Sequence, residues 1–169
     1  FASAGNGTGG HLSGELFKLL AGIDLLHIPY KGVAPALVDV VAGQVSMTFA
    51  SLISGTPHYK SGRLRALAVT GAKRSVALPE LPTMQEAGVK GYESATWYGM
   101  LAPAGTPPEI INKLNTEIVA ILRQPEINDR LSQEGAEPVG NTPQQFAAHI
   151  RSEIDKWRKV IRAAGIKAG

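Results

Sequence analysis

The sequence predicts an α/β fold with a mostly parallel sheet, followed by a region built only of helices. Three observations support this prediction. Residues 1–102 alternate short apolar runs with segments of helical periodicity, a pattern typical of parallel strands joined by helices. Residues 106–169 carry helical patterns alone. The 19 glycines and 11 prolines are spread along the chain, as expected of many short elements joined by tight turns.

The first elements are predicted from apolar runs and from the residues that end them. Residues 1–4 form the end of a strand that leads into a glycine-rich turn. A helix is expected over residues 8–21, because its leucines fall on one face and Gly22 supplies a helix stop. Residues 25–29 are predicted as a short buried strand, and residues 33–42 as the second helix.

The rest of the α/β part is predicted from shorter signals. Strand-like runs are expected at residues 45–49, 64–70 and 94–102, a short helix at residues 51–60, and one helical turn at residues 83–87.

Three amphipathic helices are predicted after the proline-rich stretch that ends at Pro108. Thr106 is expected to cap the first helix, Pro125 opens the second, and Thr142 caps the third. Their apolar stripes need a surface to cover. They either pack on the sheet of the first part or belong to a sheet that this chain does not contain.

Composition and charge exclude several classes of function. The net charge of +3 comes from scattered basic residues, which gives no stripe for nucleic acid. The absence of cysteine excludes disulfides, thiolate metal sites and cysteine nucleophiles. The four histidines are isolated in sequence, so no metal site is predicted, and no serine lies in a nucleophile elbow. No catalytic residue is therefore predicted.

The strongest chemical signal is the G-x-G-x-x-G pattern of Gly5, Gly7 and Gly10 at the start of the first helix. Unpaired backbone N–H groups at a helix start attract anions, and glycines let a ligand approach closely. A phosphate or carboxylate site is therefore predicted there. The alternative is a purely structural turn, capped by Thr8.

A dinucleotide-binding site would use the same three glycines. That motif also needs an acidic residue at the end of the second strand. Asp24 lies before that strand, and Asp39 lies within the second predicted helix. A nucleotide-dependent enzyme that uses the Gly5-Gly7-Gly10 loop is therefore kept only as the alternative function.

The loop after the second predicted strand, Pro29-Tyr30-Lys31-Gly32, is a second candidate for ligand contact. It follows a strand and precedes a helix, which places it at the edge of the sheet where ligands bind. Tyr30 offers a ring and a hydroxyl. Lys31 is expected to be a solvated surface charge.

Several segments in matching order resemble the substrate-binding proteins of tripartite tricarboxylate transporters, the TctC-like Bug family. The matching segments are Ser3-Ala4-Gly5-Asn6-Gly7-Thr8 with His11-Leu12, His27-Ile28-Pro29-Tyr30-Lys31-Gly32 with Pro35-Ala36, Gly62-Arg63-Leu64-Arg65-Ala66-Leu67-Ala68-Val69-Thr70, Leu78-Pro79-Glu80-Leu81-Pro82-Thr83, Glu86-Ala87-Gly88, and Trp97-Tyr98-Gly99 with Ala102-Pro103-Ala104-Gly105-Thr106-Pro107. The similarity runs over the whole chain.

The resemblance implies a periplasmic solute-binding protein that captures a small carboxylate and passes it to the membrane permease subunits of a transporter. It implies no cofactor and no catalysed reaction. It also implies that residues 1–102 are the second of two lobes of the type II periplasmic-binding-protein kind. Residues 103–169 would then be a hinge and C-terminal helices that pack on a first lobe, which is absent here. The chain begins at Phe1 without Met, so we expect a processed or truncated product.

Candidate ligand-binding residues follow from the matching motifs. They are Ser3, Gly5, Asn6, Gly7, Thr8, His11, Tyr30, Ala50 and Ser51. Many family members have Asp where Ala50 stands, so its loss favours a plain carboxylate over an amino acid. Trp97 and Tyr98 fit a hinge or core role and a ligand role equally well.

One further hypothesis belongs to a different functional class, an interaction module without a small ligand. Uncovered apolar helices also predict that the chain, taken alone, self-associates and binds carboxylates weakly.

Overall fold

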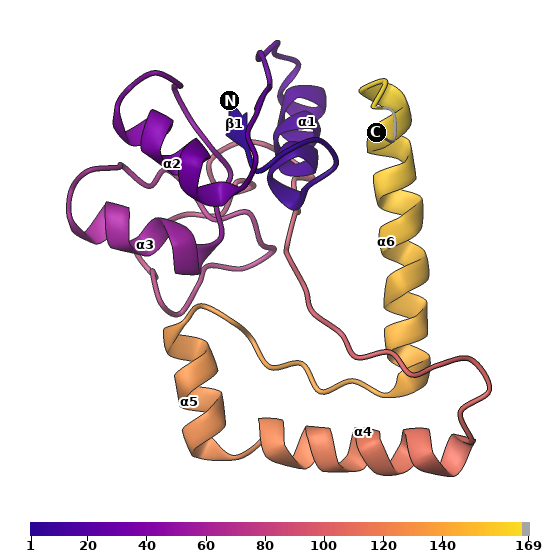
Figure 1. Cartoon of the computed structure of the whole chain (residues 1–169). Helices are drawn as coiled ribbons and strands as arrows, with labels where there is room; N and C mark the ends of the chain where they lie inside the picture. The colour runs from indigo at the N-terminus through magenta and orange to yellow at the C-terminus, as the bar shows by residue number, and fades with distance from the viewer. Residues whose placement is uncertain (167–169) are drawn as a thin grey trace. The chain divides into compact units, whose positions relative to one another are not determined.

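The computed structural model describes residues 1–166, which form two compact units (Figure 1). One unit joins Phe1–Thr96 to the end of the chain from Trp157 onward, and the other is Trp97–Lys156. The elements are β1 (Ala2–Ser3), α1 (Gly9–Ala21), β2 (Ile28–Pro29), α2 (Val33–Val41), α3 (Leu52–Lys60), α4 (Pro108–Leu122), α5 (Pro125–Gln133) and α6 (Pro143–Ala163). The roles predicted for residues 1–102 and 103–169 remain a prediction.

The first unit is organised around β1, which has a parallel neighbour on each side. Ala2 pairs with Ile28 and Ser3 with Pro29 in β2, and Ala2 also forms an isolated parallel bridge with Thr48. The carboxyl ends of three parallel segments therefore meet at one edge. The predicted α/β class with a parallel sheet is confirmed.

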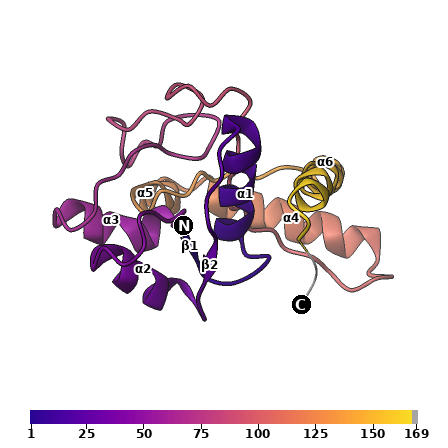
Figure 2. The same ribbon diagram turned by 90° about the horizontal axis from the view of Figure 1, so that it is seen from above.

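Helices α1 and α2 flank β1 in both views (Figures 1 and 2). The side chains around β1 alternate between these two helices. Ala2 is fully buried in a cluster with Ala36 of α2. Phe1 lies on the α1 side, so close to Gly14 that a Cβ there would overlap its ring. Ser3 points the same way as Phe1, because alternate residues of a strand share a face. The polar side chain of Ser3 is thus placed at the start of α1.

Helix α1 has the predicted end signals. Thr8 is its N-cap residue, and Gly22 ends it in the left-handed conformation. Its core contact is Leu16, which packs with Tyr92 and with Val160 of α6. The leucines predicted on one face do not all reach the core, since Leu19 and Leu20 are exposed.

Most predicted strands are shorter in the structure or are absent from it. The strand predicted at residues 25–29 is only Ile28–Pro29, and the runs at residues 45–49 and 64–70 contribute single bridges at Thr48 and Val69. The run at 94–102 forms no strand. The physical reason is that extended segments need a neighbour along their length. In these segments isolated hydrogen bonds take the place of a continuous strand ladder. One of them runs from the Ser94 N–H to the Thr70 carbonyl at 2.8 Å.

The helices of the second unit begin with proline or a polar cap. Thr142 and Gln145 form a reciprocal pair of bonds at the start of α6, with N···O distances of 2.9 and 3.2 Å. The predicted cap at Thr106 is wrong, because Pro107 is the N-cap residue of α4. The Thr106 hydroxyl instead donates to the Pro103 carbonyl at 2.8 Å, which closes the preceding turn.

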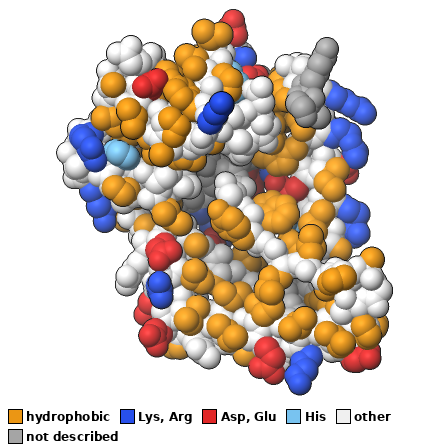
Figure 3. Space-filling model, viewed as in Figure 1, with side chains coloured by type: hydrophobic (Ala, Val, Ile, Leu, Met, Phe, Trp, Pro, Cys, Tyr) orange, Lys and Arg blue, Asp and Glu red, His pale blue; other side chains and the backbone are white. Residues whose placement is uncertain are grey.

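Helix α4 carries an exposed apolar stripe. Ile110, Leu114 and Ile121 are each about half exposed. Figure 3 shows hydrophobic side chains gathered over this part of the visible face. Within the described residues, no helix is long and apolar enough to cross a membrane.

Candidate functional site

The candidate site is centred on the glycine loop, defined here as residues 5–8 between β1 and α1. Gly5 has φ +136° and Gly7 has φ +74°, and side chains rarely adopt either conformation. A Cβ at Gly5 would also lie 3.2 Å from the Tyr30 carbonyl oxygen. The turn itself therefore requires positive φ angles at both positions, which glycine adopts without strain, whatever ligand the loop binds.

Thr8 closes the loop from within. Its hydroxyl donates to the Gly5 carbonyl at 2.7 Å and makes no capping bond to α1. The first N–H groups of a helix have no acceptor inside the helix. No hydrogen bond is formed by the N–H groups of Gly9 and Gly10 within residues 1–166. The start of α1 thus retains free donors with partial positive charge.

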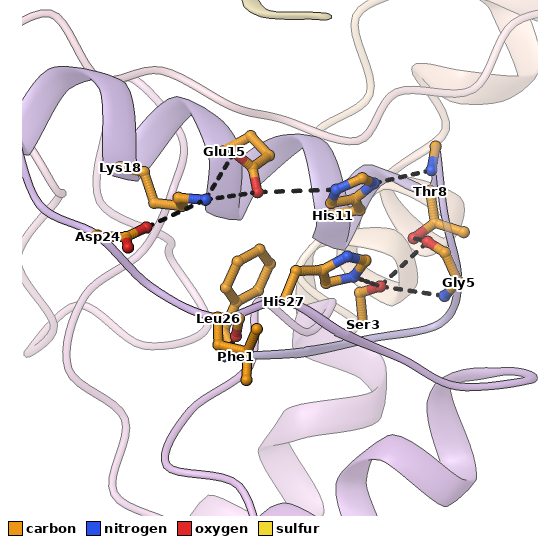
Figure 4. Close-up of polar contacts among 11 residues, drawn as sticks. Phe1, Ser3, Gly5, Thr8, His11, Glu15, Lys18, Asp24, Leu26 and His27 are labelled. Atoms are coloured by element: carbon orange, nitrogen blue, oxygen red, sulfur yellow. Dashed lines mark hydrogen bonds and ion pairs between the residues drawn. The ribbon is translucent and has the colours of Figure 1, made fainter. Parts of the chain in front are cut away.

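Ser3 supports the loop from the sheet (Figure 4). It is 2% exposed, and its hydroxyl accepts the Gly5 N–H at 3.1 Å. The same hydroxyl lies 2.6 Å from Nε2 of His27. Of the predicted site residues, Ser3 is the most deeply buried, and its hydroxyl already has protein partners.

His11 points from α1 back toward the loop rather than outward. Its ring is buried, and its Nδ1 accepts the Gly7 N–H at 3.0 Å. Its Nε2 lies 3.8 Å from a carboxylate oxygen of Glu15. The His11 and His27 rings stack in parallel, with centroids 3.8 Å apart and planes 7° apart.

Burial is the main influence on both imidazoles. It lowers the pKa of His11, and the nearby Glu15 carboxylate opposes that effect. Burial, with a smaller contribution from the adjacent His11, lowers the pKa of His27 to about 4. Both rings are therefore uncharged at neutral pH.

Tyr30 lies at the carboxyl end of β2, as predicted, but its hydroxyl is already bonded. It donates to Asp39 of α2 at 2.6 Å, and its ring packs on the cluster around Ala2. This bond to a carboxylate raises the pKa of Tyr30. Lys31 is exposed, in agreement with the expectation of a solvated charge.

Ala50 and Ser51 lie directly before α3. Both residues are exposed, and Ser51 caps α3 by accepting the Ser54 N–H at 3.3 Å. A Cβ at Gly10 would lie only 2.9 Å from the carbonyl oxygen of Phe49. Because of this close approach, the start of α1 and the segment before α3 adjoin at the same edge of the sheet.

The structure thus brings Ser3, the glycine loop and His11 together and places Ala50 and Ser51 beside them. Asn6 is exposed at the tip of the loop. The ligand-binding roles of these residues stay predictions. Sequence reasoning missed the part played by His27, which it treated as an isolated histidine. The available signal was the position of His27 directly before β2, the strand that pairs with Ser3.

A metal ion has no evident place in this arrangement. Residues 1–166 contain no group of three His, Cys, Asp or Glu side chains that could hold one.

A family model described as tripartite tricarboxylate transporter family receptor, TctC, matches residues 1–166. The chain belongs to this family. A curated TctC relative from Pseudomonas sp. strain P51, named as a protein of the tcbD-tcbE intergenic region, is 42% identical and is matched over 95% of this chain and 48% of its own length. Protein BugT of Bordetella pertussis is 38% identical over 99% of this chain and 51% of its own length.

Two solved structures extend the comparison. The R. palustris protein Rpa4515, solved with adipate, is 44% identical with a TM-score of 0.87, over 98% of this chain and 56% of that one. MatC of Rhodopseudomonas palustris, solved with bound malate, is 32% identical with a TM-score of 0.77. The match covers 95% of this chain and 55% of MatC. This TctC chain therefore spans about half the length of these four relatives.

Proposed function

We propose that this chain is one lobe, with the C-terminal helices, of a periplasmic solute receptor that captures a small carboxylate for a tripartite tricarboxylate-type transporter. The observation that supports it most directly is the start of α1, where N–H groups without protein acceptors adjoin the glycine loop. The two relatives solved with ligands hold dicarboxylates, adipate and malate.

The chemistry of the loop suits a carboxylate better than a bulky or cationic ligand. The ligand oxygens would meet backbone N–H groups and the partial positive charge of the helix start. Residues 4–8 contain no cationic side chain, so neutral donors would supply the recognition. Charge-assisted hydrogen bonds of this kind are stronger than bonds between neutral groups.

A receptor of this type closes two lobes on its ligand, because contacts from both sides select the closed state. This chain would supply one side. The other would come from the remaining half of the length seen in its relatives. The receptor would then deliver the ligand to membrane permease subunits and catalyse no reaction.

The alternative of a nucleotide-dependent enzyme has no support in the residues that follow β2. Tyr30 and Lys31 stand where the ribose-binding acid of a dinucleotide site belongs. Asp24 is fully exposed and lies 3.8 Å from Lys18.

The proposal is tested by adding bulk to the glycine loop without changing its backbone. Gly7 has φ +74°, and a Cβ there would meet no atom within 4 Å, so Asn fits the fold, since it tolerates this conformation. We expect Gly7→Asn to weaken adipate or malate binding by more than about tenfold, equivalent to about 1.4 kcal/mol, because the side chain blocks close approach to the helix start.

Gly22→Asn is the matched control, since Gly22 has φ +65°, also has open space, and ends α1 far along the chain from the loop. Calorimetry on the complete protein should show wild-type affinity in this variant and no heat from NAD. Equal affinity in Gly7→Asn and wild type would place the site elsewhere. NAD binding without dicarboxylate binding would favour the enzyme alternative.

A further inference from the structure

We propose that His11 and His27 are positioning residues that hold the glycine loop in its binding geometry, and that His11 does so only while its imidazole is uncharged. This inference rests on the proposed carboxylate-binding function of the loop. In this inference His11 acts by holding the loop rather than by contacting the ligand. The same role is given to His27, which is not among the predicted ligand-binding residues.

The two rings hold opposite ends of the same loop (Figure 4). On one side, the Gly7 N–H donates to Nδ1 of His11 at 3.0 Å. On the other, Nε2 of His27 contacts the Ser3 hydroxyl at 2.6 Å, and that hydroxyl accepts the Gly5 N–H at 3.1 Å. Stacking at 3.8 Å joins the two supports into one unit.

The hydrogen-bond geometry fixes the protonation state of His11. An Nδ1 atom that accepts an N–H bond must carry a lone pair, so the proton of the neutral ring is on Nε2. Protonation of Nδ1 would set two N–H donors against each other at Gly7. The loop would then lose its support on the α1 side.

A proton on either ring also affects the other. Two cationic rings at this separation repel each other, and the repulsion is strong where water is excluded. The charged groups of the described residues that face the pair are Glu15 and Lys18 of α1. Glu15 favours the charged forms, whereas Lys18 opposes them. Lys18 also lies 3.2 Å from Glu15, so it neutralises part of that carboxylate's effect.

The sign of the pH dependence follows from these directions. The pKa of each ring in the folded protein lies below the ordinary value of 6.5. The intact loop therefore persists at pH values above 6.5. It becomes less favourable as the pH falls below 6.5 and His11 takes up a proton. Protonation of the stacked His27, whose pKa is about 4, adds repulsion between the rings.

The first test reads the rings directly. Nitrogen NMR of the complete protein near neutral pH should show His11 as the Nε2–H tautomer and a Gly7 amide protected from exchange. Acidification should shift the His11 nitrogens and expose that amide together. A charged His11 near neutral pH, or a ring protonated on Nδ1, would overturn the proposal even if no dicarboxylate binds.

The second test exploits the different reach of Asn and Gln. An Asn amide can place an oxygen where Nδ1 of His11 lies, whereas a Gln amide can reach the position of Nε2 of His27. We expect His11→Gln and His27→Asn to weaken adipate or malate binding by roughly tenfold, the loss of one hydrogen bond. His11→Asn and His27→Gln should regain part of that loss.

The pH profile separates positioning from simple packing. His11→Asn should show a smaller loss of affinity than wild type between neutral and mildly acidic pH. Ligand protonation is the same in both proteins and cancels in the comparison. His58→Gln, in α3, is the control and should keep the wild-type profile. Identical profiles for wild type and His11→Asn, with binding intact, would refute the inference and leave the proposed function standing.

Discussion

Substitution of Gly10 tests the close contact on which the start of α1 depends. An added Cβ would lie 2.9 Å from the Phe49 carbonyl oxygen and 3.8 Å from Cβ of Ser3. The first distance is shorter than a normal contact, and its partner is backbone, which cannot rotate away. Overpacking of this kind costs about 1–3 kcal/mol. Ala in a helix instead contributes up to about 1 kcal/mol relative to Gly. We therefore expect Gly10→Ala to lower the free energy of unfolding by roughly 1–2 kcal/mol.

Gly9→Ala is the matched control, since it adds the same methyl group one residue earlier. The nearest atom to a Cβ at Gly9 is Oγ1 of Thr96 at 3.7 Å, an ordinary contact. Urea unfolding of the two variants and wild type should rank Gly9→Ala at or above wild type and Gly10→Ala below it. Equal stability of the two variants would show that the approach of α1 to Phe49 is loose, and the reasoning about this edge of the sheet would fail.

Two further predictions concern ligand binding and the apolar helices. Dicarboxylate affinity should change little as the Debye length shrinks from about 30 Å to 3 Å between 0.01 and 1 M salt, because short hydrogen bonds are screened less than exposed charges. A steep loss, measured by calorimetry, would implicate exposed Lys31 instead. The 169-residue chain studied alone should self-associate through surfaces such as the α4 stripe of Ile110, Leu114 and Ile121. Sedimentation that shows a monomer over a wide concentration range would contradict this.

The helices were predictable because their signals are local. Gly22 ends α1, Pro125 opens α5, and Thr142 caps α6, each through contacts within a few residues. The strands were predicted less well. An apolar run such as residues 64–70 has the right composition, but only a neighbouring segment can turn it into a strand, and that neighbour is a tertiary property.

The candidate site shows the same division. The glycine loop was predicted because three glycines at fixed spacing carry a conformational requirement, which the positive φ angles of Gly5 and Gly7 meet. The bond between Tyr30 and Asp39 and the stacking of His11 on His27 could not be predicted, because both depend on how separate elements pack. The separation of 16 residues between the two histidines has no periodicity that would reveal their contact.

The cluster of Leu16, Tyr92 and Val160 has a consequence for synthesis of the chain. Leu16 and Tyr92 leave the ribosome well before Val160 has been made. At about 5–20 residues per second, their apolar surface waits several seconds for Val160 of α6. During that interval the sheet and α1 can form local contacts, but this core lacks one of its members. Assembly of the first unit therefore ends only with the C-terminal turns of α6, although its glycine loop is translated long before them.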